Sequence, residues 1–193
     1  MDASLPAPVV ARTDALHPDG QYGTLAKLFH WTTVLLIAVA LPVGFVIKHI
    51  KDDDQMAFYA IHESAGLTVF FVVILRLLWR RLSPPPALPG HVPAVMRAVA
   101  NGVHHALYAL LILQPLLGFF ATNAQGYPLQ GETAYFRLID LPKFMEANAW
   151  LGGWLQGIHT VFGWALLVLL AAHIGGALFH HLIRRDGSLL RML

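Results

Sequence analysis

The sequence has no cysteine and little charge, and each shortage excludes classes of protein. Charged residues make up 12% of the 193 residues and hydrophobic residues 56%, against about 25% charged in an average soluble domain. So few charges cannot form a water-soluble surface. The lack of cysteine excludes structural disulfides, covalent c-type haem, thiolate metal sites and ordinary iron–sulfur clusters. Any redox chemistry in this chain must use other ligands.

Four apolar stretches each approach the roughly 20 residues needed to cross a bilayer. They run over about residues 25–47, 56–78, 99–122 and 155–182. They predict an all-α integral membrane protein, an antiparallel bundle of four transmembrane helices. Residues 1–23, with several prolines and no apolar period, are expected to form an N-terminal tail, and residues 24–193 the membrane domain. An even number of crossings places both termini on one side.

The basic residues predict which side that is. If the termini are cytoplasmic, nine Lys and Arg side chains lie inside and four outside, as the positive-inside rule requires. The inner nine are Arg12, Lys27, Arg76, Arg80, Arg81, Arg97, Arg184, Arg185 and Arg191, and the outer four are Lys48, Lys51, Arg137 and Lys143. Because these residues gather at span ends and not among aromatics, nucleic-acid binding is not expected.

Histidine is unusually frequent, with 11 residues, and four of them fall inside the apolar spans: His30, His62, His159 and His173. An ionisable side chain within a span is costly and is usually functional. Neutral imidazole ligates iron through one ring nitrogen while the other bonds a backbone carbonyl. The alternative, that all four only bond between helices, fits less well with their matched depths.

Depth in the membrane predicts how the four histidines pair. His159 and His173 are 14 residues apart on one expected helix, which places them nearly on one face and about 21 Å apart. His30 lies near the inner end of the first helix, and His62 near the outer end of the second. We therefore predict an inner haem between His30 and His173 and an outer haem between His62 and His159.

Other residues near these positions have less certain roles. Gly66 and Gly163 each follow a histidine by four residues, where a missing side chain would leave room for a macrocycle. His104 and His105 could be interfacial, could bond a haem propionate, or could ligate iron. His180, seven residues after His173, could replace it as the inner ligand.

Seven segments together carry a resemblance to a known family. They are LFHW around His30, AIHESAG around His62, VILRLLWRRLSPPP, HHALYALLILQPLLG, GIHTVFGWALL around His159, LAAHIGGALFHHL around His173, and DGSLLRML. From about Thr24 to Leu193 the chain resembles the bacterial cytochrome b561 family. In that family four histidines bind two b haems, which implies His30, His62, His159 and His173 as axial ligands in a bacterial inner-membrane protein.

The resemblance implies electron transfer, because two axial histidines leave no open iron position for oxygen. A characterised bacterial cytochrome b561 oxidises superoxide at the periplasmic side and reduces ubiquinone. Other relatives are cytochrome subunits that serve hydrogenases or partner dehydrogenases. We expect a superoxide:ubiquinone oxidoreductase, with an electron-carrier subunit as the alternative.

The expected substrates, superoxide and ubiquinone, suggest candidate binding residues. The outer cations Lys48, Lys51, Arg137 and Lys143 could attract superoxide, although each could equally be an ordinary solvated charge. The neighbouring acidic run, Asp52, Asp53 and Asp54, argues against a uniformly positive surface that would attract superoxide. Ubiquinone would need a lipid-accessible cleft, with candidate side chains either at the outer face (Tyr135, Arg137, Lys143) or at the inner face (Arg97, His104, His105). The long connection after the third span is expected to shield the outer face.

Overall fold

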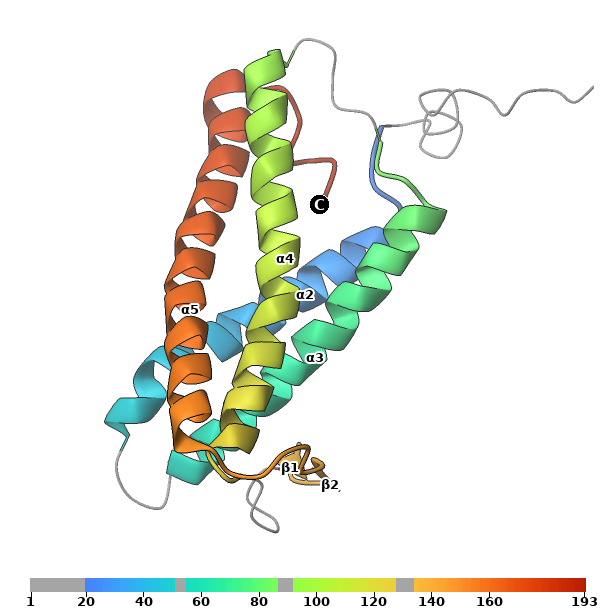
Figure 1. Ribbon diagram of the computed structural model, residues 1–193. Helices are drawn as coiled ribbons and strands as arrows, with labels where there is room; N and C mark the ends of the chain where they lie inside the picture. Colours follow the sequence, from blue (N-terminus) through green and yellow to red (C-terminus); the bar gives the residue numbers. More distant parts are fainter. Residues whose placement is uncertain (1–19, 51–54, 87–91, 128–133) are drawn as a thin grey trace, which may run out of the picture.

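The computed structural model describes residues 20–50, 55–86, 92–127 and 134–193 (Figure 1). Within them lie four helices long and apolar enough to cross a membrane, which confirms the expected bundle. The helices are Thr24–Val46 (α2), Gln55–Leu82 (α3), Ala94–Ala124 (α4) and Ala149–Leu178 (α5). A 3₁₀ turn, Ile47–His49 (η1), follows α2, and a π-helical turn, Phe179–Arg184 (η2), follows α5. Residues 1–19, most of the expected tail, lie outside the described residues.

Two helices begin earlier than their apolar stretches. α4 begins at Ala94, directly after Pro93, and α5 begins at Ala149, after Asn148. The Asn148 side-chain oxygen accepts a hydrogen bond from the Leu151 backbone N–H at 3.0 Å. A cap of this kind satisfies a free N–H at the helix start. The start of α5 is therefore set by local hydrogen bonding, not by where its apolar residues begin.

The four helices form two antiparallel hairpins. α2 packs along α3, α4 packs along α5, and α3 contacts α4 between the hairpins; Figure 1 shows the two pairs crossing obliquely. The buried core lies where three of the helices meet, and consists of Val69, Val73, Leu107, Leu111 and Leu166. Many other large apolar side chains are exposed, as expected of a surface that faces lipid.

The connection from α4 to α5 folds back onto α3. It contains two short antiparallel strands, Ala134–Tyr135 (β1) and Ile139–Asp140 (β2). The Tyr135 hydroxyl lies 2.9 Å from the Thr68 hydroxyl, and the Phe136 backbone N–H donates to the Ser64 hydroxyl at 2.8 Å. These bonds attach the strands to the half of the bundle that holds His62.

The opposite end of the bundle is closed by the C-terminal segment. The Tyr22 N–H donates to the Arg191 carbonyl at 3.0 Å, and the Trp31 indole N–H donates to the Met192 carbonyl at 3.1 Å. The Arg191 side chain in turn donates to the Gly20 carbonyl at 2.7 Å. The two described ends of the chain therefore lie together, as four crossings require.

Asp186 holds this closing segment in place. Its side chain is 3% exposed and accepts from the Ser188 backbone N–H and hydroxyl, while His180 and Arg184 approach it from η2. Burial alone would raise the pKa of Asp186, but the hydrogen bonds from Ser188 and His180 outweigh it and hold the pKa below its usual range. Asp186 is therefore expected to be ionised in the folded protein.

Asp186→Ala is expected to destabilise the protein by about 2 kcal/mol, because it removes hydrogen bonds to a buried charge. The measurement is the midpoint of thermal unfolding in detergent. Because the folded-state pKa is lowered, this stabilisation is present above the unfolded-state pKa of about 4 and is lost as the pH falls below it. The difference between wild type and variant should therefore shrink on acidification. Glu146→Ala, which breaks the exposed pair with Lys143, is the control and should cost less than about 1 kcal/mol.

Candidate haem-binding site

Two histidines from different hairpins face each other in the half of the bundle next to β1 and β2, which the sequence predicts to be the outer half. The ring centroids of His62 on α3 and His159 on α5 are 6.0 Å apart, with ring planes at 89°. His62 Nδ1 lies 2.8 Å from the Ala40 carbonyl, and His159 Nδ1 lies 3.1 Å from the Gln114 carbonyl. A carbonyl only accepts, so both Nδ1 atoms carry the proton and both Nε2 lone pairs are free for a metal.

Each of the two rings bonds a backbone carbonyl on a neighbouring helix, and in both cases a glycine lies four residues after that carbonyl. Ala40 precedes Gly44 on α2, and Gln114 precedes Gly118 on α4. A Cβ at Gly44 would lie 2.5 Å from His62 Cε1, and a Cβ at Gly118 would lie 3.1 Å from His159 Cε1. A side chain at Gly44 would therefore force the His62 ring or its surroundings to move, whereas one at Gly118 would press on the His159 ring less severely.

A second pair of histidines faces across the opposite half of the bundle, which the sequence predicts to be the inner half. The ring centroids of His30 on α2 and His173 on α5 are 6.3 Å apart, with ring planes at 65°. His30 Nδ1 differs from that of the outer histidines, because its neighbour is the Arg76 guanidinium at 3.1 Å and not a carbonyl. The structure thus brings together both pairs that depth in the membrane suggested.

The histidines with open roles lie in different surroundings. The His104 ring is 5.2 Å from that of His173, beside it at the inner end. His105 bonds the Asn101 carbonyl at 2.7 Å on the exposed side of α4. His180 bonds Asp186 at the closing segment, whereas it is His173 that faces His30.

Both facing pairs have the separation that a single iron between them would need. Metal–imidazole bonds are about 2 Å each, and the distance from ring centre to nitrogen adds about 1 Å on each side, so two axial rings lie about 6 Å apart. The His62–His159 and His30–His173 separations of 6.0 and 6.3 Å match this value, and the 5.2 Å between His104 and His173 is too short. Among the described residues, no group of three or more His, Asp or Glu side chains is arranged for a bare metal ion.

The glycines expected to make room for a macrocycle do not touch the histidine rings. A Cβ at Gly66 would meet no atom within 4 Å, and one at Gly163 would lie 3.4 Å from the Gln114 amide nitrogen. Their role beside a macrocycle stays a prediction. Helical periodicity within α3 and α5 pointed to them, whereas Gly44 and Gly118, on neighbouring helices, were missed.

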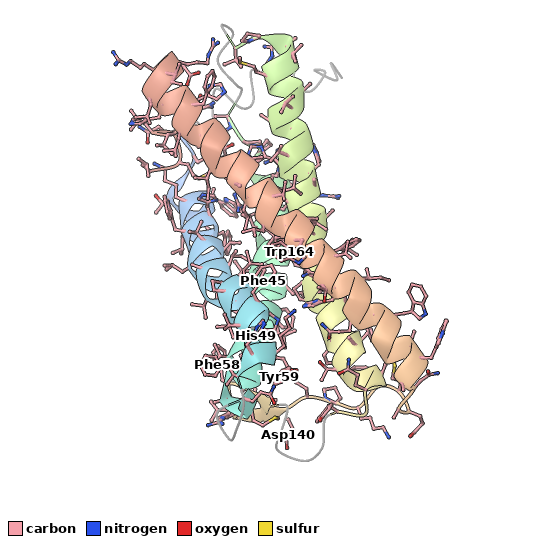
Figure 2. All side chains as sticks on the ribbon, turned by 90° about the vertical axis from the view of Figure 1, so that its left-hand side faces the viewer. Phe45, His49, Phe58, Tyr59, Asp140 and Trp164 are labelled. Carbon is pink, nitrogen blue, oxygen red and sulfur yellow. The ribbon has the colours of Figure 1, made fainter. Side chains whose placement is uncertain are left out.

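The outer cations come from separate segments. Lys48 is exposed in η1, and Arg137 is exposed beside β1 with a left-handed backbone (φ 59°). Lys143 pairs with Glu146 at 2.9 Å, and Lys51 lies outside the described residues. Figure 2 shows His49, Phe58, Tyr59 and Asp140 at the same end of the bundle, with Phe45 against Trp164 further in, their rings 4.6 Å apart.

The candidate quinone-binding residues lie at the two ends of the helix bundle. Tyr135 is held on α3 by its bond to Thr68, and Arg137 and Lys143 are exposed on the outer connection. Arg97 lies in the first turn of α4, on the same helix as His104 and His105. The geometry does not favour one group over the other.

Comparison with known proteins points to one family. The family model described as prokaryotic cytochrome b561 matches residues 21–193. Cytochrome b561 homolog 2 of Escherichia coli K12 is 30% identical over 176 residues, covering 90% of this chain and 91% of the relative. Cytochrome b561 homolog 1 of the same organism is 29% identical (85% and 92% covered), and the probable superoxide oxidase CybB of Yersinia pestis is 27% identical (90% and 96% covered). These matches confirm the resemblance identified from the sequence.

Proposed function

The chain belongs to the prokaryotic cytochrome b561 family, and on that basis we propose that it transfers single electrons from superoxide to ubiquinone through two b-type haems. Membership of this family shows the general class of protein. The chain is a membrane-embedded electron-transfer protein of a family that binds haem b, with four helices able to cross a bacterial membrane.

One observation carries the two-haem proposal. Each of two facing imidazole pairs, 6.0 and 6.3 Å apart, joins α5 to the other hairpin. Because His159 and His173 are 14 residues apart on α5, the pairs are about 21 Å apart along the helix. Bound haem would supply reversible one-electron chemistry at each level.

Groups of the protein around the haems would limit which reactions the haems can carry out. The Ala40 and Gln114 carbonyls hold the outer imidazoles in the tautomer that offers Nε2. His62 with His159, and His30 with His173, would hold the two haems, which would supply electron transfer and not oxygen activation. Superoxide would then react at the haem edge, and outer cations such as Lys48 and Arg137 would raise its local concentration.

The proposed reaction balances as two one-electron oxidations and one two-electron reduction. Two superoxide anions release two electrons and leave as dioxygen. One ubiquinone takes those electrons with two protons and becomes ubiquinol. The distribution of basic residues supports the orientation in which His62 and His159 lie toward the periplasm and the chain termini lie in the cytoplasm.

The first experiment mixes the oxidised protein with a superoxide pulse in a stopped-flow spectrometer and follows the reduced b-haem bands. We expect rapid haem reduction, which is abolished by superoxide dismutase and is followed by reoxidation only when ubiquinone is present. Haem that stays oxidised with superoxide, yet is reduced by a partner dehydrogenase, would instead indicate an electron-carrier subunit.

Charge variants test the superoxide side independently. Arg137→Glu and Lys48→Glu should each lower the bimolecular rate of haem reduction several-fold at low salt, and the difference should fade at high ionic strength. Arg81→Glu, an exposed arginine in the last turn of α3 at the opposite end of the bundle, is the matched control and should leave this rate unchanged. If haem reduction in all three variants were as fast as in wild type, the outer cations would have no part in attracting superoxide.

A further inference from the structure

Two guanidinium groups lie together at the inner end of the bundle, beside His30. Arg76 and Arg80, one turn apart on α3, approach the same Tyr108 ring on α4, with Cζ 5.4 and 5.9 Å from its centroid. Arg76 also lies 3.1 Å from His30 Nδ1. In the described part of the chain, neither arginine forms a salt bridge with a carboxylate. A guanidinium within an apolar span normally has a counter-ion.

The contact between Arg76 and His30 makes the need for an anion more specific. A guanidinium can only donate, so His30 Nδ1 must accept in this contact. A neutral imidazole that ligates through Nε2 carries its proton on Nδ1 and cannot accept there. Ligation by His30 therefore requires Arg76 to have another acceptor close by. The outer histidines have no such conflict, because their Nδ1 atoms face carbonyls.

We propose that Arg76, with Arg80 beside it, binds a propionate carboxylate of the haem held between His30 and His173, and so positions that haem. The inference rests on the proposed inner haem. A guanidinium presents two parallel N–H donors to a carboxylate, which gives both charge and direction. Both guanidinium groups lie against the same Tyr108 ring and so stay close to each other. The phosphate of an acidic lipid offers similar anionic chemistry and is the alternative source.

The test compares protohaem with protohaem dimethyl ester, in which both propionates are uncharged. Full-length protein produced without haem is titrated with each, and binding is followed by absorbance. For wild type we expect the ester to bind the inner site at least tenfold more weakly. Arg76→Gln should bind the two haems with similar affinity at that site. Arg81→Gln, an exposed arginine on the same helix, should keep the wild-type preference.

A second readout uses the holoprotein and does not depend on reconstitution. A cation beside the haem favours the ferrous form, so Arg76→Gln should lower the midpoint potential of one haem and leave the other unchanged, while Arg76→Lys should be intermediate. A wild-type protein that takes up the ester as tightly as protohaem would overturn the proposal; fewer acidic lipids co-purifying with Arg76→Gln would then identify phosphate as the partner. A wild-type protein that binds only one haem would contradict the proposed inner haem. Neither readout involves superoxide.

Discussion

Replacing His62 with alanine is expected to remove one b-type haem and leave the other. The ring of His62 faces that of His159, and alanine offers no nitrogen to the iron. His159→Ala should lose the same haem, whereas His30→Ala and His173→Ala should lose the inner one. Haem content, measured as the pyridine haemochrome, should fall from about two per chain to about one in each variant.

The spectrum of the remaining haem decides whether the pairing is right. The two outer variants should share one reduced spectrum and one midpoint potential, and the two inner variants should share another. Identical remaining spectra in all four variants would contradict the pairing. His105→Ala, whose ring bonds the Asn101 carbonyl on the exposed side of α4, is the control and should retain both haems.

Gly44→Ala is expected to remove most of the outer haem although it changes no ligand. The new methyl group would lie 2.5 Å from His62 Cε1, so we expect the ring to shift and to lose its hydrogen bond to the Ala40 carbonyl. Loss of the hydrogen-bond partner of a ligating imidazole lowers metal affinity by about 10- to 100-fold. The measurement is the haem content together with the spectrum and potential of the haem that remains.

Gly118→Ala should have a smaller effect, because its methyl group would lie 3.1 Å from the His159 ring and a small shift relieves that contact. Gly102→Ala, on the same helix with no atom within 4 Å, is the matched control. It should retain both haems and gain slightly in helix stability. Equal haem loss in Gly102→Ala and Gly44→Ala would show that glycine matters here for the backbone and not for the ring.

The features that depend on one helix at a time could be predicted from the sequence. Each span is a run of apolar residues, and the depth of His30, His62, His159 and His173 follows from counting residues along a helix. The boundaries were less accurate, since α4 begins directly after Pro93 without a side-chain cap, and α5 begins at a cap formed by the Asn148 side chain.

The features that depend on how neighbouring helices are rotated could not be predicted. Glycine is frequent in transmembrane helices, so nothing in the sequence alone distinguishes Gly44 and Gly118 from other glycines. The contact of Arg76 with His30 joins residues 46 positions apart. The fold-back of Tyr135 onto Thr68 likewise depends on where the strands dock.

The arrangement of the two hairpins has a consequence for how the protein is made. α5 contributes one histidine to each facing pair, and the partners lie on α2 and α3 of the other hairpin. With haem bound at both pairs, each iron would be a cross-link between the first and second halves of the chain. Cofactor insertion would thereby complete biogenesis, since a ligand that binds only the assembled form stabilises it. Cells short of haem should accumulate a loosely associated precursor exposed to membrane proteases.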